Sequence, residues 1–493
     1  MSALLASVPL AVVLFGMGLL RLSAAVAGAI GLAIAVLLSA TIFGAGAAPL
    51  GPARLLWGAF AEALHSTATI LWIVLPALAI FEFQKRSGAI ARMRDTLAAL
   101  TEDRRLQVIL IAWFFGLFME GAAGFGTPVA LAAPLLVGLG YDPVRAVVLA
   151  LLGHAAGVSF GAVGTPVLAQ VEVSDLSAPD IAVRTAVLHA ICGPVLLVWM
   201  VRLAGGAPLS RADLSWTALA AICFLGPSLA LAILIGPELP SLGGALVGAA
   251  GFVAILRWRR GGPDLRLRPL LPDVTPYLLI LFLVLVTRLV PSVQEGLTGL
   301  SFRWTLWDRF GGSFSPLYHP GTILFLGLLI GAAAQGRAAL LGGAVSSALR
   351  RAVPVALALM VMLALSRLMV HSGMVGMLAT TAASAGPAWP ILAPLVGVLG
   401  TFITGSATAS NILFTELQVS TAQSLGWPAT MLVAAQGFGA AIGNVIAPHN
   451  IIAGCATVGL VAREGEVLAR TATPCLVYAL LGGAVAYLGL LLA

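Results

Sequence analysis

The stretch "FMEGAAGFGTPVAL" (residues 118–131) places a carboxylate, three glycines and a proline at the end of a long apolar run. A glutamate in the middle of a membrane costs about 2.5–3.5 kcal/mol to insert, so it normally faces a cavity or a partner. Free backbone groups at membrane depth likewise need a cavity or a protein environment. Glu120 and its glycines therefore predict a broken helix beside a cavity, although a glutamate at the interface or capping the glycine turn is the simpler alternative.

The whole chain has the composition of a membrane protein. Its 493 residues are 60% hydrophobic and only 9% charged, whereas soluble domains carry about 25% charged residues. Apolar runs long enough to span a bilayer recur from residue 4 to residue 492. They predict one all-α polytopic transporter domain over residues 1–493, with roughly 12–16 transmembrane or re-entrant helices of about 20 residues or fewer.

The charged segments predict the topology. Residues 84–105, 257–268 and 337–351 are rich in arginine, whereas residues 172–180 are acidic. Basic loops stay on the cytoplasmic side of a bacterial membrane. We therefore expect the three basic segments inside and the acidic one outside, with residues 291–316 as the largest external loop.

Two parts of the chain resemble each other. "EGAAGFGTP" (120–128) aligns with "TGSATASNI" (404–412), and "GAVGTP" (161–166) aligns with "GNVIAP" (443–448). Corresponding Gly/Pro-interrupted segments in two halves are typical of the binding site of a secondary transporter. We predict pseudo-repeat halves at residues 60–260 and 318–493, with broken helices and hairpins. Chance similarity between Ala/Gly-rich helices is the alternative, and the pattern does not distinguish inverted from parallel repeats.

The two glycine-rich stretches supply the candidate substrate site. A helix that restarts after the break presents free N–H groups and a positive dipole end, which suit an anion. Small residues at helix crossings also occur where nothing binds. The substrate-binding candidates are Gly121, Ala122, Gly124, Gly126, Thr127, Ser406, Thr408, Ser410 and Asn411. Arg367 is added as a bidentate carboxylate anchor, its alternative being an interfacial charge.

Two buried titratable residues are candidates for proton coupling. Desolvation disfavours a charged carboxylate, so Glu120 is expected to take up and release a proton. His154 is the candidate relay because histidine titrates near neutrality, although a packing histidine is equally compatible. Asn444, within the "GNVIAP" motif, and His449, directly after its proline, are possible cavity-lining residues.

The sequence holds no Walker loop, HExxH or CxxC motif. We expect no enzyme activity, no catalytic residue, no cofactor, no metal and no nucleic-acid partner. An intramembrane enzyme would need a nucleophile–base or metal cluster at membrane depth, which the scattered histidines do not supply. A channel is more naturally an oligomer of few helices than one chain with two similar halves.

At these residues the sequence resembles the bacterial lactate permease family. "EGAAGFGTPVALAAPLLVGLGYDP" (120–143) and "HAAGVSFGAVGTPV" (154–167) resemble its first signature region. "LVGVLGTFITGSATASNILF" (395–414) and "ATVGLVAREGEVLART" (456–471) resemble the second. The resemblance implies a multi-pass symporter of the bacterial plasma (inner) membrane, surrounded by lipid, that moves lactate, and often glycolate, with protons.

Three positions depart from the family's best-known branch. Ala407 stands where that branch has Asp, and Asn444 and His449 stand where it has Lys and Gln. The changes remove one acid and one base near the expected site. The alternatives are therefore a carrier of the same architecture for a dicarboxylate or an inorganic anion, or one coupled to sodium.

Overall fold

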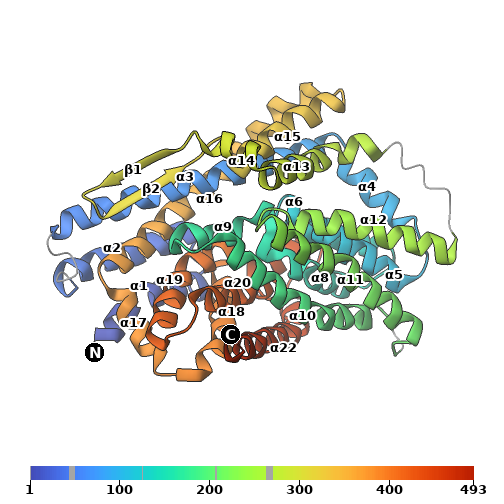
Figure 1. The fold of residues 1–493 in the computed structure, drawn as a ribbon. Coiled ribbons are helices and arrows are strands. Elements are labelled where there is room, and N and C mark those ends of the chain that lie inside the picture. Colours follow the sequence, from blue (N-terminus) through green and yellow to red (C-terminus); the bar gives the residue numbers. More distant parts are fainter. Residues whose placement is uncertain (1, 44–49, 125, 206–207, 262–269, 493) are drawn as a thin grey trace.

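The computed structural model describes residues 2–43, 50–124, 126–205, 208–261 and 270–492. Across these ranges twelve helices are long and apolar enough to cross a membrane, and most run from left to right in Figure 1. Two short antiparallel strands, β1 (Phe302–Leu306) and β2 (Phe310–Phe314), form a hairpin within the predicted external loop. The prediction of an all-α polytopic membrane protein is confirmed, with this hairpin as an addition.

The charged segments gather at two opposite ends. At one end, which we call the basic end, Arg86 Nη2 donates to Ser347 Oγ at 2.8 Å and Arg92 Nε donates to Asp273 Oδ2 at 2.7 Å. At the other, the acidic end, Arg367 donates to the carbonyl of Glu172. The positive-inside rule assigns the basic end to the cytoplasm. Residues 262–268 of the second basic segment lie outside the described residues.

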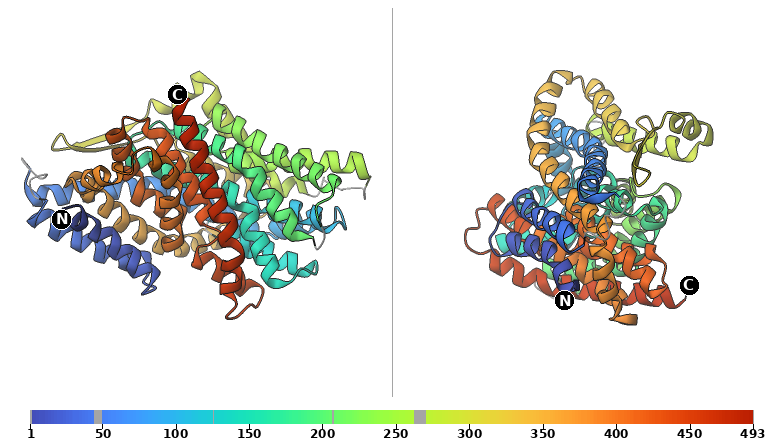
Figure 2. Two further views of the ribbon diagram at one scale, coloured as in Figure 1. Left: turned by 90° about the horizontal axis from the view of Figure 1, so that it is seen from below. Right: turned by 90° about the vertical axis from the view of Figure 1, so that its left-hand side faces the viewer.

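The first helices and the middle of the chain form a layer along one side of the molecule. The long helices α3 and α16 pack along each other at its centre, and α2 and α15 flank them. Seen from the acidic end, the yellow helices near α15 lie at the top and the red C-terminal helices at the bottom (Figure 2). The layer comprises α1 (Ser2–Gly18), α2 (Ala24–Thr41), α3 (Gly51–Arg86), α4 (Ala89–Ala98), α13 (Leu271–Leu289), α14 (Pro291–Thr298), α15 (Pro320–Ala334), η5 (Ala338–Leu340) and α16 (Leu341–His371).

The opening stretch forms the tip of hairpin 1, whose two arms start and finish at the basic end. The first arm is the continuous helix Arg104–Ala122 (α5, Arg104–Val108; η2, Ile109–Phe115; α6, Gly116–Ala122), and the second is α7 (Thr127–Gly138). Gly126 precedes α7 with a φ of 75°, a left-handed conformation that favours glycine. At the open end, the Tyr141 hydroxyl donates to the carbonyl of Arg104 at 2.6 Å, and burial raises the pKa of Tyr141 to about 12.

A broken helix follows hairpin 1. It comprises α8 (Pro143–His154), η3 (Ala155–Phe160) and α9 (Gly161–Ser174). Ala162, Val163 and Gly164 have left-handed backbone angles, so the second helical part starts at Thr165, directly before Pro166. The sequence motif "GAVGTP" is therefore the break itself. The chain continues through α10 (Ala178–Ala204), α11 (Arg211–Leu234) and α12 (Pro240–Arg260).

The C-terminal part repeats the arrangement. Hairpin 2 consists of α18 (Trp389–Thr404) and α19 (Ala407–Leu425), joined at Gly405 with a φ of 71°. The second broken helix consists of α20 (Ala429–Gly443) and α21 (Pro448–Thr457), separated by the aligned motif "GNVIAP". The remaining helices are α17 (Met374–Ala383), η6 (Gly386–Ala388) and α22 (Glu464–Leu491).

The two hairpins enter from opposite ends. The open end of hairpin 1 lies at the basic end, where Arg260 Nη1 donates to Asp103 Oδ2 at 3.0 Å. The open end of hairpin 2 lies at the acidic end, because Val419 packs in one cluster with Ile181 and Leu176. Hairpins that enter from opposite sides are the arrangement of inverted repeats.

Candidate functional site

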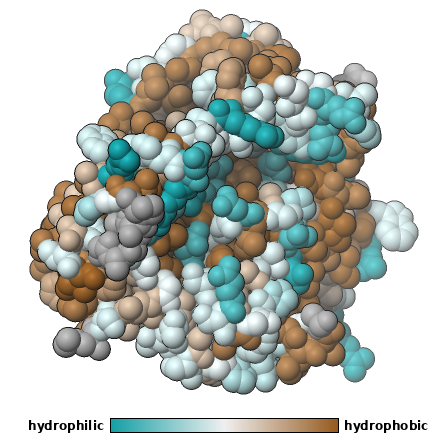
Figure 3. Space-filling model, turned by 60° about the vertical axis from the view of Figure 1, so that its left-hand side comes forward, coloured by the Kyte–Doolittle hydropathy of each residue, from teal (hydrophilic) through white to brown (hydrophobic). Residues whose placement is uncertain are grey.

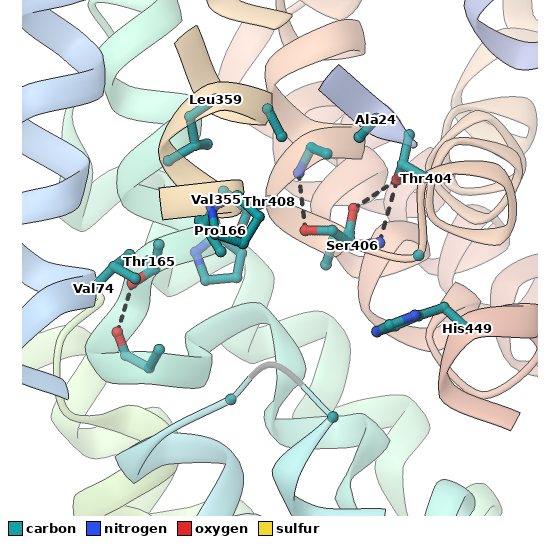
Figure 4. A pocket seen from close by; sticks show the side chains of 18 of the residues that line it. Ala24, Val74, Thr165, Pro166, Val355, Leu359, Thr404, Ser406, Thr408 and His449 are labelled. Atoms are coloured by element: carbon teal, nitrogen blue, oxygen red, sulfur yellow. Dashed lines mark hydrogen bonds between the residues drawn. The ribbon is translucent and has the colours of Figure 1, made fainter. Parts of the chain in front are cut away.

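A cavity of about 810 Å³ lies where the hairpin tips and the helix breaks meet α2, α3 and α16. Its wall includes both hairpin tips at Gly124 and Gly405 and both breaks at Gly161 and Asn444. Figure 4 shows Thr165 on one side of it and Ser406 and His449 on the other, with Pro166 and Thr408 drawn between them. The parts of the sequence that align as a repeat thus share one site.

Four helix N-termini contribute to the wall of this cavity. They belong to α7 at Gly126, to the second part of α9 at Thr165, to α19 at Ser406 and to α21 at His449. Helix N-termini carry free N–H groups and a partial positive charge. The four together make the cavity suitable for an anion.

The two halves interlock around the cavity. Gly126 of hairpin 1 faces Oδ1 of Asn450 in the second broken helix, and Gly405 of hairpin 2 faces His449. Asn411 Nδ2 in α19 donates to the carbonyl of Pro166 in the first broken helix at 2.9 Å. Hairpin 1 therefore contacts the second broken helix, and hairpin 2 contacts both broken helices.

Glu120 lies in the last turn of α6 and lines the cavity. It is 5% exposed, and its carboxylate packs against Gly161 and Gly124. Among the described residues it has no ion-pair or hydrogen-bond partner. An ionised carboxylate is costly to bury without a cation, so Glu120 is the group in the wall best suited to exchange a proton.

The sequence-predicted residues fall into those at the cavity and those behind it. The cavity wall includes Glu120, Gly124, Gly126, Ser406, Thr408, Asn444 and His449. Ala407, Asn444 and His449, the three departures from the family's pattern, all belong to the wall. The expectation that Asn444 and His449 line a cavity agrees with their position in the structure.

Three residues of the first stretch lie behind the wall. Gly121 packs closely against the backbone of Leu242 in α12, and Ala122 is buried. The Thr127 hydroxyl donates to the carbonyl of Gly124 at 2.8 Å. In this conformation these residues shape the hairpin tip, and their role as substrate ligands stays a prediction.

Ser410 and Asn411 are fully buried inside the protein. The Ser410 hydroxyl donates to the carbonyl of Gly397 at 2.9 Å, which ties the two arms of hairpin 2 together. Asn411 accepts from Gln436 Nε2 at 3.1 Å in addition to its bond to Pro166. Both residues hold hairpin 2 in place; they lie between the lining residues Ala409 and Ile412 but do not themselves line the cavity.

His154 lies at the end of α8, one residue layer behind the cavity. Its Nδ1 bonds to the carbonyl of Ala150 at 2.7 Å, and the side chain of Asn444 lies near its ring. A nitrogen that faces a carbonyl oxygen must carry the proton. Asn444 lines the cavity, and the relay role of His154 stays a prediction.

Arg367 lies near the acidic end of α16, apart from the described residues that line the cavity. It donates to the carbonyls of Glu172 and Val173, the latter at 3.3 Å, and its Nε lies 3.7 Å from Glu62 Oε2. It joins α16 and α3 to the C-terminal end of α9. Its predicted contact with a substrate carboxylate is untested, and in this conformation it closes the acidic end.

The sequence reasoning missed several residues of the wall, above all Arg351. It was grouped with a basic loop, but α16 begins ten residues earlier, and Arg351 lines the cavity. Thr165 and Asn450 were also missed, although each offers a polar side chain within two residues of a proline of an aligned motif. That closeness to the helix break is the signal that could have identified them.

The cavity opens toward the basic end. Along α3 its wall runs from Ile70 to Leu78, in the half of that helix nearer the basic end, and along α16 it runs from Arg351 to Met362, across the middle of the helix. The Arg351 side chain is 41% exposed, whereas Ser66, farther along α3 toward the acidic end, is buried. At the acidic end hydrophilic side chains gather between apolar sides (Figure 3).

The scattered titratable groups offer little to a metal. Among the described residues no group of three or more His, Cys, Asp or Glu side chains could hold a metal ion. The four cysteines Cys192, Cys223, Cys455 and Cys475 are all free thiols, and three of them are buried. The polar part of the wall consists of helix ends, small polar side chains, His449, Arg351 and one buried acid, Glu120.

Membrane-spanning helices, two hairpins and two broken helices around a buried polar cavity define the class of this protein: it is a multi-pass membrane transporter. The chain belongs to the L-lactate permease family, whose sequence profile matches residues 2–264 and 270–492. The protein is accordingly a permease of the bacterial inner membrane.

The relatives are similar along almost their whole length. The glycolate permease GlcA of Escherichia coli (strain K12) is 30% identical over 535 residues, covering 97% of this chain and 94% of that protein. The L-lactate permease of Bacillus subtilis (strain 168) is 28% identical, covering 96% and 92%. The L-lactate permease of Salmonella typhi is also 28% identical, covering 98% and 95%.

Two solved transporters share the fold. The YdaH transporter of Alcanivorax borkumensis superimposes with a TM-score of 0.55 at 15% identity, covering 93% of this chain and 97% of that one. MtrF of Neisseria gonorrhoeae, described as one of a class of antimetabolite efflux pumps, superimposes with a TM-score of 0.52 at 15% identity and 96% coverage of both chains. At this level of identity the likeness extends to the fold alone.

Proposed function

We propose that the protein carries lactate, or a related small hydroxy-monocarboxylate such as glycolate, across the inner membrane by proton symport. The names of its relatives support this substrate class, since they include both a glycolate permease and L-lactate permeases. The single observation that carries the proposal is the cavity between the hairpin tips, where four helix N-termini surround one buried acid.

The substrate carboxylate binds among the helix N-termini. Gly124 and Gly126 leave the backbone of hairpin 1 open to the cavity, while Ser406 and Thr408 add hydroxyl groups from hairpin 2. A carboxylate gains both hydrogen bonds and a favourable dipole at such helix ends. The 2-hydroxyl group of lactate or glycolate needs a neutral polar partner, and Thr165 and Asn450 lie in the same wall.

Glu120 carries the proton. Its carboxylate lies at the C-terminal end of α6, and the ends of broken helices in secondary transporters serve coupling ions in this way. When Glu120 is protonated as the anion binds, the loaded site carries one negative charge fewer. His154 is the second group of the proton path, because Asn444 lies near its ring and lines the cavity.

A carrier for a dicarboxylate or inorganic anion, or one coupled to sodium, is the second candidate. A divalent anion is best held by more than one cation, and Arg351 is the one arginine or lysine among the described residues of the wall. The polar oxygens of Ser406, Thr408 and Asn450 are suitable ligands for sodium as well as for a hydroxy acid.

Uptake into proteoliposomes tests the function. Purified protein is reconstituted, and uptake of labelled lactate and glycolate is measured first under an imposed pH gradient and then under a sodium gradient at equal pH. We expect accumulation driven by the pH gradient and abolished by a protonophore. Accumulation driven by sodium alone, or no uptake under either gradient, would contradict the proposal.

A further inference from the structure

Arg351 brings a permanent positive charge into the wall of the cavity. Among the described residues that line it, no other arginine or lysine is present. Its Nη1 donates to Glu82 Oε1 of α3 at 2.8 Å, and its guanidinium lies 5.5 Å from the centre of the Phe81 ring. Two adjacent residues of α3 therefore hold the arginine side chain in one orientation.

The guanidinium keeps binding capacity in this orientation. Glu82 is buried and occupies Nη1, while the Arg351 side chain remains 41% exposed. Guanidinium groups bind carboxylates through two parallel N–H···O bonds, which gives both strength and orientation. An exposed arginine that is already oriented loses less side-chain freedom when a carboxylate binds.

Arg351 also occupies the place that an anion from the basic end meets first. It marks the end of the wall nearest the basic end along α16, and the hairpin tips and Glu120 lie deeper. A carboxylate that enters from this end passes the arginine before it reaches the helix N-termini. Without Arg351, an anion would enter a cavity whose wall holds the carboxyl group of Glu120 and no arginine or lysine among its described residues.

We propose that Arg351 receives the substrate carboxylate at the cytoplasmic mouth of the cavity and that Glu82 is the positioning residue that orients it. The inference rests on the proposed function, and it names the residue that binds the substrate from the inside. It differs from the role of an ordinary basic residue at a membrane interface, which fixes topology without touching substrate.

Inside-out and right-side-out membrane vesicles separate these roles, because they expose opposite faces of the protein. The Michaelis constant for labelled lactate is measured in both for the wild type, Arg351→Gln and Arg351→Lys. Arg350→Gln is the matched control, since Arg350 is the exposed neighbour and does not line the cavity. Competition by lactamide, the neutral analogue of lactate, reports whether the carboxylate is what the arginine recognises.

We expect Arg351→Gln to raise the constant about tenfold in inside-out vesicles, the usual effect of losing one charge-assisted hydrogen bond, and much less in right-side-out vesicles. Lysine should restore part of the loss, and competition by lactamide should not change. Arg351→Gln leaves the buried Glu82 without its partner and could fail to insert into the membrane. The double variant Arg351→Gln/Glu82→Gln removes this unpaired acid, and it should show the same rise in the Michaelis constant.

The results distinguish the two proposals. Wild-type vesicles without lactate or glycolate uptake would overturn the proposed function and this inference with it. Wild-type uptake with an unchanged constant in both the single and the double variant would overturn the inference alone. Arg351 would also have a structural role if the Michaelis constant rose equally in both kinds of vesicle, or if competition by lactamide weakened as much as lactate binding.

Discussion

Gly161 lies so close to Glu120 that a Cβ atom at position 161 would collide with Oε1 of the carboxylate. Gly161 has a φ of −63°, which any residue adopts, so the glycine is needed for space. The start of α9 thereby fixes where the buried acid of hairpin 1 points. The proposed proton-coupling residue and the helix break are in contact here.

The first prediction is that Gly161→Ala displaces Glu120 and impairs transport. The added methyl group should lower pH-driven lactate uptake about tenfold to a hundredfold, because small displacements of a functional group have effects of this size. Overpacking should cost about 1–3 kcal/mol of stability. Uptake in proteoliposomes and thermal unfolding in detergent measure the two effects.

Gly138→Ala is the matched control for this variant, since a Cβ at position 138 meets nothing within 4 Å. It should transport at the wild-type rate. Normal pH-driven uptake by Gly161→Ala would show that the position of Glu120 does not matter for coupling.

Substitution of Ser406 tests whether the N-terminus of α19, in hairpin 2, binds the substrate. Its hydroxyl accepts from the backbone N–H of Ala409 at 3.3 Å and lines the cavity. Loss of an N-cap costs about 1 kcal/mol, so Ser406→Ala should raise the Michaelis constant for lactate about fivefold while the maximal rate changes little. Ser424→Ala, at the exposed end of the same helix, is the control. A constant that stays at the wild-type value would remove Ser406 from the substrate site.

Arg367 should act as a closure of the acidic end. Its bonds to Glu172 and Val173 join α16 to α9, so Arg367→Gln should loosen that contact. A cysteine placed at Ser66, which is buried in the closed conformation, should then react severalfold faster with a membrane-impermeant maleimide added outside. Labelling of the four native cysteines is measured in Arg367→Gln without the Ser66 substitution and subtracted.

Arg303→Gln, an exposed arginine on β1, is the control for Arg367. It should leave labelling unchanged. Equal labelling in Arg367→Gln, combined with a raised Michaelis constant for external lactate, would favour the alternative in which Arg367 contacts the substrate carboxylate.

The broken helices and their places in the chain were predictable from sequence. Glycine and proline disrupt helices wherever they occur, so the "GAVGTP" and "GNVIAP" motifs mark local backbone events that need no knowledge of distant contacts. The direction of the repeats was not predictable, because it depends on which end each hairpin enters from.

Side-chain destinations across the fold were harder to predict. Ser410 and Asn411 carry the polar groups expected of a site, but they bond to neighbouring backbone and do not line the cavity, although Ala409 and Ile412 on either side of them do. Arg351, part of a basic segment of the sequence, lines the cavity, and Arg367 lies apart from its described wall, because the packing of α16 against α3 determines which residues of the helix face the open space.

Simultaneous recording of lactate and proton movement shows whether Glu120 couples a proton to the substrate. Lactate is added to lightly buffered proteoliposomes, and external pH is followed together with uptake. The wild type and the control Glu416→Gln, an acid of α19 outside the described cavity wall, should alkalinise the medium as lactate enters. Glu120→Gln should exchange lactate without any pH change. Lactate-dependent alkalinisation by Glu120→Gln equal to that of the wild type would contradict this coupling role.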